Sequence, residues 1–282
     1  MHKSNTITDA LADAIEQLKK TSSSPALDGE VLLSFVVAKD RAWLYTHSNN
    51  ELTKEEINHY ETLISKRGMG IPVAHLTGTK EFYGRSFIVT KDVLIPRPAT
   101  EELVATALQS IKVDPPDQIV DIGTGSGCIA VTLACETSDI PIIAVDVSPK
   151  ALAIAQKNAD RHGVTKRIQF VEGNLFTSEI LRLAQDDRRK ILVVANLPYL
   201  PTHTITKELL HESQLALDGG SDGHELYRKL DQQLQEFSTQ NDVAITLISE
   251  RLAYLNDTSV PSFTISTHTF PGANAISSPP SV

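Results

Sequence analysis

The chain has 282 residues, of which 41% are hydrophobic and 22% are charged, and its formal net charge is -9. One hydrophobic core rarely serves a chain of this length, so two domains are expected, and the acidic balance lacks the broad basic field of a duplex-binding protein, so direct nucleic-acid binding is not expected. The sequence shows no signal-peptide pattern and no apolar run of about 18 residues, and we therefore expect a cytoplasmic protein that does not bind a membrane.

Short amphipathic helices are predicted for the first part of the chain. Apolar residues recur at helical spacing within 7–20 and again within 27–37. Thr53-Lys54-Glu55-Glu56 is a capping box, which indicates the start of a further helix. These helices predict a small N-terminal helical bundle domain, which we place at residues 1–78.

The composition changes after this helical part. Residues 81–89 carry β-forming side chains around a glycine and predict a hairpin, so 79–98 is assigned as a β-hairpin linker. A helix over 100–110 follows, and strands then alternate with helices, which implies a parallel sheet covered on both faces. The predicted strands are 119–122, 142–145, 168–171, 191–195 and 243–248, with 264–269 as a candidate edge strand. We expect an α/β, Rossmann-like domain over 99–282.

The cysteines and histidines do not indicate a metal site. Cys128 and Cys135 lie in one apolar helical pattern, which is typical of buried, reduced thiols. The nine histidines are scattered, without an HExxH motif or Cys and His pairs at ligand spacing. We therefore expect no bound metal.

The first candidate site is the glycine loop Gly123-Thr124-Gly125-Ser126-Gly127, which follows a predicted strand and opens a helix. Glycine permits a tight turn there and lets a ligand approach the backbone closely. Asp146 ends the next predicted strand, where a carboxylate can accept hydrogen bonds from both hydroxyls of a ribose. Together these features predict a nucleotide-type cofactor. The GxGxG spacing is typical of methyltransferases, although the loop alone does not separate NAD from S-adenosylmethionine.

The second candidate site is Asn196-Leu197-Pro198-Tyr199, which follows the predicted strand 191–195 at the edge where open α/β sheets bind ligands. An amide or aromatic amino nitrogen is a weak nucleophile because its lone pair is delocalised. The Asn196 carboxamide oxygen and a neighbouring backbone carbonyl can accept its two N–H groups and orient it. Pro198 stiffens the loop, and Tyr199 offers a ring that packs on a planar group. The motif predicts methyl transfer to a planar nitrogen, driven by alignment and carbonyl dipoles, with Asn196, Pro198 and Tyr199 as catalytic residues.

With these motifs the chain resembles a known family, the N5-glutamine methyltransferases that modify peptide chain release factors. The resemblance covers most of residues 25–250, and its most family-specific part is Ile95-Pro96-Arg97-Pro98-Ala99-Thr100-Glu101. It implies a protein-(glutamine-N5) methyltransferase that uses S-adenosylmethionine to methylate the glutamine of a Gly-Gly-Gln loop. It further implies that the N-terminal domain helps to dock the release factor, and we expect a monomer to act on this protein substrate.

The resemblance also implies roles for individual residues by their positions. The implied cofactor contacts are Gly123, Thr124, Gly125, Ser126, Gly127, Asp146, Asn174, Leu175 and Asn196. The implied substrate contacts are Asn196, Leu197, Pro198, Tyr199 and Arg97.

Several positions depart from the family pattern. Leu197 replaces the first proline of Asn-Pro-Pro-Tyr, Ala99 replaces an acid, Asn174 replaces a common aspartate, and His211-Glu212-Ser213 replaces Phe-Glu-Pro. Because Asn-Leu-Pro-Tyr resembles the ribosomal-RNA adenine dimethyltransferases, adenine N6 methylation of RNA or DNA is an alternative. A catalytically impaired module that binds release factors is another.

Overall fold

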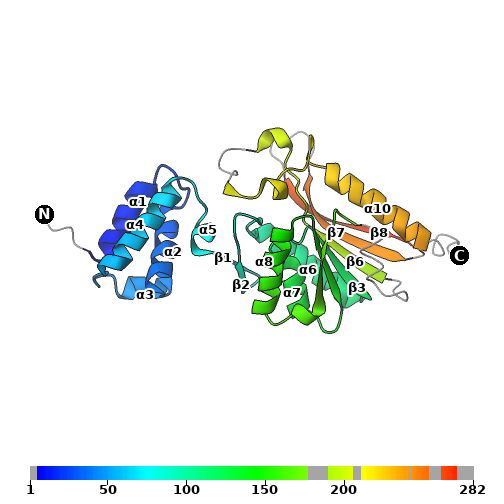
Figure 1. The fold of residues 1–282 in the computed structure, drawn as a ribbon, viewed down its shortest axis with the longest axis horizontal. Helices are drawn as coiled ribbons and strands as arrows, with labels where there is room; N and C mark the ends of the chain where they lie inside the picture. Colours follow the sequence, from blue (N-terminus) through cyan, green and yellow to red (C-terminus); the bar gives the residue numbers. More distant parts are fainter. Residues whose placement is uncertain (1–4, 177–189, 206–210, 242, 254–261, 272–282) are drawn as a thin grey trace. The chain divides into compact units, whose positions relative to one another are not determined.

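The computed structural model describes residues 5–176, 190–205, 211–241, 243–253 and 262–271 (Figure 1). The chain forms two compact units, Met1–Thr79 and Lys80–Val282, and each is described by itself. Within the described ranges, no helix has both the length and the apolar character needed to cross a membrane.

The first unit is helical. Its helices are α1 (Ile7–Leu18), α2 (Pro25–Val37), α3 (Arg41–Thr46), α4 (Lys54–Gly68) and α5 (Val73–Thr77). Helices α1, α2 and α4 pack together, and Leu18, Leu32 and Ile64 are buried between them (Figure 1). The capping box predicted at the start of α4 is confirmed, since Thr53 Oγ1 accepts the Glu56 N–H and the Glu56 carboxylate accepts the Thr53 N–H. The amphipathic pattern read from the sequence therefore gives the expected bundle.

The second unit is built on a six-stranded sheet in the order β5-β4-β3-β6-β7-β8. The first five strands run parallel, as predicted, and β8 pairs antiparallel with β7 at the edge. The sheet strands are β3 (Gln118–Ile122), β4 (Ile142–Asp146), β5 (Ile168–Glu172), β6 (Lys190–Ala195), β7 (Ala244–Ala253) and β8 (Ser262–Phe270). The predicted end of the strand at residue 248 is wrong, because β7 continues to Ala253.

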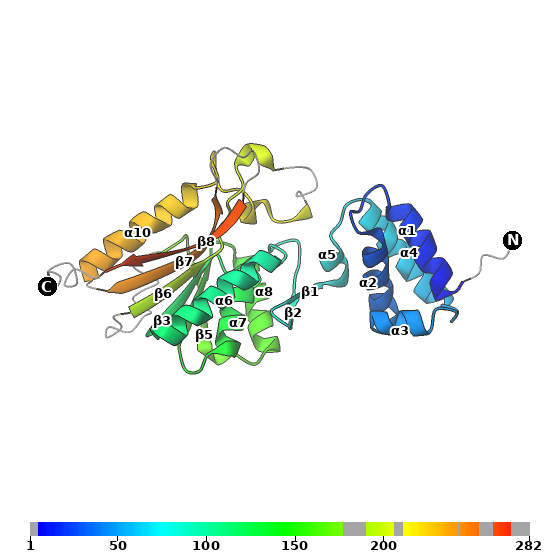
Figure 2. The ribbon, with the colours of Figure 1, turned by 180° about the vertical axis from the view of Figure 1, so that it is seen from behind.

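Helices cover both faces of this sheet (Figures 1 and 2). Helices α6 (Pro98–Val113), α7 (Cys128–Glu136) and α8 (Pro149–Arg161) bury one face, and α10 (Glu225–Asn241) buries the other. Alternate residues of β3 divide between the two cores: Ile119 faces the first, and Val120 faces the second. Short 3₁₀ turns lie at Thr165–Arg167, Thr202–Thr204 and Gln214–Ala216. The sheet is therefore buried on both sides, as the apolar strand sequences require.

The hairpin of β1 (Thr79–Phe82) and β2 (Arg85–Ile88) contributes to the core of the second unit. Phe82 and Phe87 are buried, and their rings meet edge to face with centroids 5.9 Å apart. The segment that the sequence assigned as a linker, 79–98, thus lies largely within the second unit, because its aromatic side chains find their burial there.

A single buried asparagine on α8 connects this hairpin to the glycine loop. Asn158 Oδ1 accepts the Ile88 N–H at 2.7 Å, and its Nδ2 donates to the Ile88 carbonyl at 3.0 Å and to the Ser126 carbonyl at 2.8 Å. Asn158 is fully buried, so its three hydrogen bonds form away from bulk water.

Replacing Asn158 with alanine is expected to lower the free energy of unfolding by about 3 kcal/mol, because three backbone groups lose their partners inside the fold. Urea denaturation of the full chain measures the change. Lys157→Ala, at the neighbouring exposed position of α8, is the control and should stay within about 0.5 kcal/mol of the parent. Equal stabilities of the two variants would contradict the connecting role of Asn158.

Candidate active site

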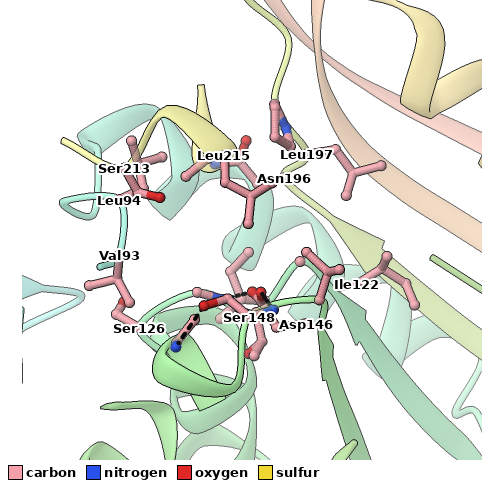
Figure 3. Close-up of a pocket in the computed structure, with 18 of the residues that line it drawn as sticks. Val93, Leu94, Ile122, Ser126, Asp146, Ser148, Asn196, Leu197, Ser213 and Leu215 are labelled. Atoms are coloured by element: carbon pink, nitrogen blue, oxygen red, sulfur yellow. Dashed lines mark hydrogen bonds between the residues drawn. The ribbon is translucent and has the colours of Figure 1, made fainter. Parts of the chain in front are cut away.

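A cavity of about 320 Å³ lies at the carboxyl edge of the parallel sheet. Figure 3 shows Asp146 and Ser148 on one side and Asn196 and Leu215 across from them. The predicted site residues that line it are Arg97, Gly123, Thr124, Gly125, Ser126, Asp146, Asn174, Leu175, Asn196, Leu197 and Pro198. Gly127 and Tyr199 are predicted site residues that do not line it. The structure thus gathers segments from 97 to 198 around one space.

The glycine loop turns between β3 and α7 with all three glycines in the left-handed region, at φ values of 75°, 55° and 79°. The backbone N–H groups of Gly123 and Thr124 both donate to the Val145 carbonyl at 2.9 Å. The turn is therefore anchored to the end of β4, and a side chain at these positions would be strained.

Asp146 fastens the loop further. Its Oδ2 accepts the Gly125 N–H and its Oδ1 accepts the Ser148 N–H, each at 2.9 Å. Burial raises the pKa of this carboxyl, and the backbone N–H groups of Ser148 and Gly125 oppose that rise. Because a carboxylate offers about four lone pairs, acceptor capacity remains for a ligand hydroxyl.

Gly127 begins α7 and lies against α8, away from the cavity. A Cβ atom added there would meet the Ala155 Cβ at 2.9 Å. The glycine therefore lets the two helices approach closely, and the cofactor contact expected at Gly127 stays a prediction.

Asp121, the fourth residue of β3 and two positions before Gly123, was not singled out from the sequence. It is fully buried, and its Oδ2 accepts from Thr124 Oγ1 at 2.7 Å and from the Ala130 N–H at 3.1 Å. Its Oδ1 has no hydrogen-bond partner among the described residues. Burial raises the pKa of Asp121 to about 7. The acid at the start of this loop was visible in the sequence, but its unpartnered oxygen is a tertiary feature.

Asn174 and Leu175 lie at the end of β5, on the cavity wall. Asn174 is exposed, whereas Leu175 is 7% exposed and packs into the core beneath α10. Leu175 adopts a φ of 61°, an uncommon conformation for a residue with a branched side chain.

Asn196 directly follows β6, and its amide is held on one side only. Its Nδ2 donates to Thr100 Oγ1 at 2.9 Å, and Thr100 Oγ1 donates to Glu250 Oε2 at 3.1 Å. The Asn196 Oδ1 atom is buried and has no hydrogen-bond partner among the described residues. A buried acceptor without a donor is uncommon in a folded protein, and a ligand N–H would satisfy it.

Leu197 is buried, and its side chain packs into the core under α10 as well as against the loop. A Cβ atom added to Gly123 would lie 3.0 Å from Leu197 Cδ2. The Leu197 N–H donates to the Tyr227 hydroxyl at 2.9 Å, and that hydroxyl donates to the Glu250 carbonyl. The hydroxyl has one proton, so the Leu197 carbonyl, 3.3 Å away, keeps lone pairs for another donor.

Tyr199 lies behind the cavity wall in a half-buried position. Burial raises the pKa of its phenol to about 12, with the charges of Glu250 and Glu212 adding to the rise and that of Arg97 opposing it. The phenol is therefore neutral near pH 7. The chain that follows is pinned, since the Leu200 N–H donates to the Leu217 carbonyl at 3.1 Å.

Arg97 lines the cavity, yet it is also paired. Its guanidinium lies 2.5 Å from the Glu212 carboxylate, which is buried and also accepts the Ile95 N–H at 3.2 Å. The resemblance implied a substrate contact at Arg97, and the structure adds that this residue ties the 95–97 segment to Glu212.

Thr100 and Glu250, which are joined to Asn196 by successive hydrogen bonds, were not predicted as site residues. Thr100 was quoted only within the family-specific stretch, and Glu250 lay beyond the predicted end of its strand. A charged residue just after an apolar run, on a strand neighbouring Asn196, is the signal that could have found Glu250.

The cavity fits S-adenosylmethionine on three observations. Apolar side chains, among them Val93, Leu94 and Ile122, offer a surface for a flat base (Figure 3). Asp146 offers acceptors for ribose hydroxyls, and the loop at Gly123 has no side chain to fill the space. Asn196 also lines the cavity, and its buried Oδ1 has no donor among the described residues, so it could accept a polar group of a ligand.

Comparison with known proteins gives matches in both units. A family model described as the PrmC N-terminal domain matches residues 9–78, and one described as a methyltransferase domain matches residues 119–219. A solved RNA methyltransferase from Salinibacter ruber, in complex with S-adenosyl-L-homocysteine, aligns with a TM-score of 0.39 at 21% identity, over 63% of this chain and 94% of that chain.

Curated relatives match along most of the chain. The release factor glutamine methyltransferase of Koribacter versatilis is 36% identical over 236 residues, which is 82% of this chain and 82% of that protein. The protein of the same name from Geobacter sulfurreducens is 39% identical over 214 residues, which is 74% of this chain and 72% of that protein. The chain therefore belongs to the release factor glutamine methyltransferase family, whose cofactor is S-adenosylmethionine.

Proposed function

We propose that this chain transfers the methyl group of S-adenosylmethionine to the side-chain amide nitrogen, N5, of the glutamine in the Gly-Gly-Gln loop of a peptide chain release factor. One observation carries the proposal: Asn196 lines the cavity together with the glycine loop and Asp146, and its buried Oδ1 has no donor among the described residues. An acceptor in this position suits a primary amide, which brings two N–H groups.

The cofactor would be held by residues 123–126 and Asp146, with Asn174 and Leu175 at the adjoining wall. S-adenosylmethionine supplies a methyl group bound to a positively charged sulfur. The Asn196 oxygen would accept one N–H of the glutamine amide, and a backbone carbonyl of the same loop would accept the other. These bonds orient the nitrogen lone pair and favour the positive charge that develops on the nitrogen, so a strong base is not needed.

We also propose that residues 1–78 form the domain that docks the release factor, and that the chain acts as a monomer in the cytoplasm, where translation takes place. The match of residues 9–78 to the PrmC N-terminal domain supports the first part. The unit also exposes large apolar side chains, since Phe35 is 45% exposed and Tyr45 is 62% exposed. Exposed aromatic groups of this kind are common anchors in protein interfaces.

The activity is tested with radiolabelled S-adenosylmethionine and purified release factor. Label should enter the wild-type factor and be absent from a variant with Gln→Ala in its Gly-Gly-Gln loop. Ribosomal RNA and DNA in parallel reactions test adenine methylation, and labelling of either one without the release factor would overturn the proposal. Binding of the release factor without any labelling would favour an impaired binding module instead.

The role of Asn196 is tested by Asn196→Ala. We expect kcat to fall by roughly 100- to 1000-fold, as for the loss of one group that orients and stabilises a developing charge. The affinity for S-adenosylhomocysteine, measured by calorimetry, should change far less. Lys157→Ala serves again as a control at an exposed site and should leave both quantities unchanged. A kcat within about threefold of the parent would remove Asn196 from the mechanism.

Asp146 should make cofactor binding depend on pH. Burial raises the pKa of this carboxyl, and only the charged form accepts fully from ribose hydroxyls. Affinity should therefore be highest above the raised pKa and should fall as the pH is lowered through it, which calorimetric titration with S-adenosylhomocysteine from about pH 8 down to the ordinary aspartate range near pH 4 measures.

Asp121 is a second buried carboxyl near the glycine loop, so its effect on the pH dependence of cofactor binding must be separated from that of Asp146. Burial raises the pKa of Asp121 to about 7, so Asp121 also titrates within the pH range of this measurement. The variant Asp121→Asn removes that titration, and the fall in affinity at low pH should persist in it. An affinity that no longer depends on pH in Asp121→Asn would assign the effect to Asp121 and contradict the role of Asp146.

A further inference from the structure

We propose that Thr100 and Glu250 are positioning residues that determine which atom of the Asn196 amide faces the substrate. The inference rests on the proposed function, in which the Asn196 oxygen accepts a substrate N–H. Nothing in the glycine loop or in the Asn196 motif itself fixes this orientation, because the two ends of a carboxamide have nearly the same shape.

The three side chains come from separate elements and form a chain of hydrogen bonds. Asn196 follows β6, Thr100 lies in the first turn of α6, and Glu250 lies in β7. Asn196 Nδ2 donates to Thr100 Oγ1 at 2.9 Å, and Thr100 Oγ1 donates to Glu250 Oε2 at 3.1 Å. Thr100 is 2% exposed and Glu250 is 1% exposed, so water does not compete for these bonds.

The number of protons on Thr100 determines which groups donate and which accept in these hydrogen bonds. Thr100 Oγ1 donates to Glu250 Oε2, and a threonine hydroxyl has only one proton to give. Because Thr100 gives its proton to Glu250, its oxygen is left as an acceptor, and Asn196 must turn its N–H₂ group toward it. The reversed amide would place Oδ1 against the lone pairs of Thr100 Oγ1.

This orientation leaves the oxygen of the Asn196 amide available to the substrate. With Nδ2 held by Thr100, the Oδ1 atom is left buried without a donor among the described residues. A glutamine side chain that arrives there with its N–H₂ group meets an acceptor. The reversed amide would present N–H to N–H, which repels the substrate and leaves donors unpaired in a buried site.

The backbone beside Asn196 is attached to the same residue of β7. The Tyr227 hydroxyl accepts the Leu197 N–H at 2.9 Å and donates to the Glu250 carbonyl. Glu250 is thereby connected to the motif twice, through its side chain to the amide of Asn196 and through its carbonyl to the following peptide. A shift of Glu250 would therefore move both the amide and its loop.

The variants Thr100→Val and Thr100→Ser separate this role from simple packing. Valine keeps the shape and removes the hydroxyl, whereas serine keeps the hydroxyl. Thr100→Val should lower kcat by on the order of 10- to 100-fold, less than Asn196→Ala, with Thr100→Ser restoring most of it. Thr132→Val, at a fully buried threonine of α7, is the matched control and should leave kcat unchanged.

A double-mutant cycle tests whether Thr100 acts through Asn196. In the Asn196→Ala background, Thr100→Val should produce no further loss of kcat, because the amide that it orients is already gone. Glu250→Gln should lower kcat less than Thr100→Val and should cost nothing further in the Thr100→Val background. Full additivity in the Thr100–Asn196 cycle would overturn the proposal.

A second readout needs no turnover. In the full chain labelled with ¹⁵N-asparagine, the side-chain N–H₂ signal absent from Asn196→Asp belongs to Asn196. This signal should shift and exchange faster with water in Thr100→Val, and return in Thr100→Ser. An Asn196 signal unchanged by Thr100→Val would overturn the positioning role. If the wild type labels no release factor while the signal responds as expected, the proposed function fails and the orientation of the amide stands.

Discussion

The register of the parallel strands is the constraint on which the site depends. Ile122 pairs with Val145 on one side and with Ala195 on the other, and Ala195 pairs with Ser249. The residues one step further along each strand therefore form a row across the sheet: Asp146, Gly123, Asn196 and Glu250. The backbone hydrogen bonds of the sheet alone bring these four positions side by side, whatever side chains they carry. Function at this edge then depends on which residue stands at each of the four positions.

The buried acids at this edge set its electrostatic character. Burial raises the pKa values of Asp121, Asp146 and Glu250, which means that the fold disfavours their charged forms. A ligand with a positive charge, such as the sulfonium of S-adenosylmethionine, favours those same charged forms. Of the three acids, Asp146 lines the cavity, so its charged form is the one that a bound cation would favour.

The sequence predicted the elements whose signal is local. Gly123, Asp146 and Asn196 each follow an apolar run, so the strand pattern places them at one sheet edge without a structure. Glu250 was missed because the polar residues after Ile248 ended the predicted strand, whereas antiparallel pairing with β8 extends β7 to Ala253. Thr100 looked like an ordinary residue of a helix start, since its partners lie 96 and 150 residues away in the chain. Contacts of this range leave no periodic trace in a single sequence.

Leu197 shows how a departure from the family pattern changes the partners of the loop. A proline at this position has no N–H, whereas leucine brings one into a buried place, and a buried donor needs an acceptor. The Tyr227 hydroxyl is that acceptor, and it holds the peptide at 2.9 Å while it donates to the Glu250 carbonyl. The leucine side chain meanwhile packs beside Gly123, where the loop has no side chain to oppose it. Neither change involves the hydrogen bond of the Asn196 side chain, because Thr100 and not residue 197 accepts from its Nδ2. In a chain with proline at position 197, the ring would restrict the backbone after Asn196. Here the hydrogen bond from the Leu197 N–H to Tyr227 of α10 restricts it instead.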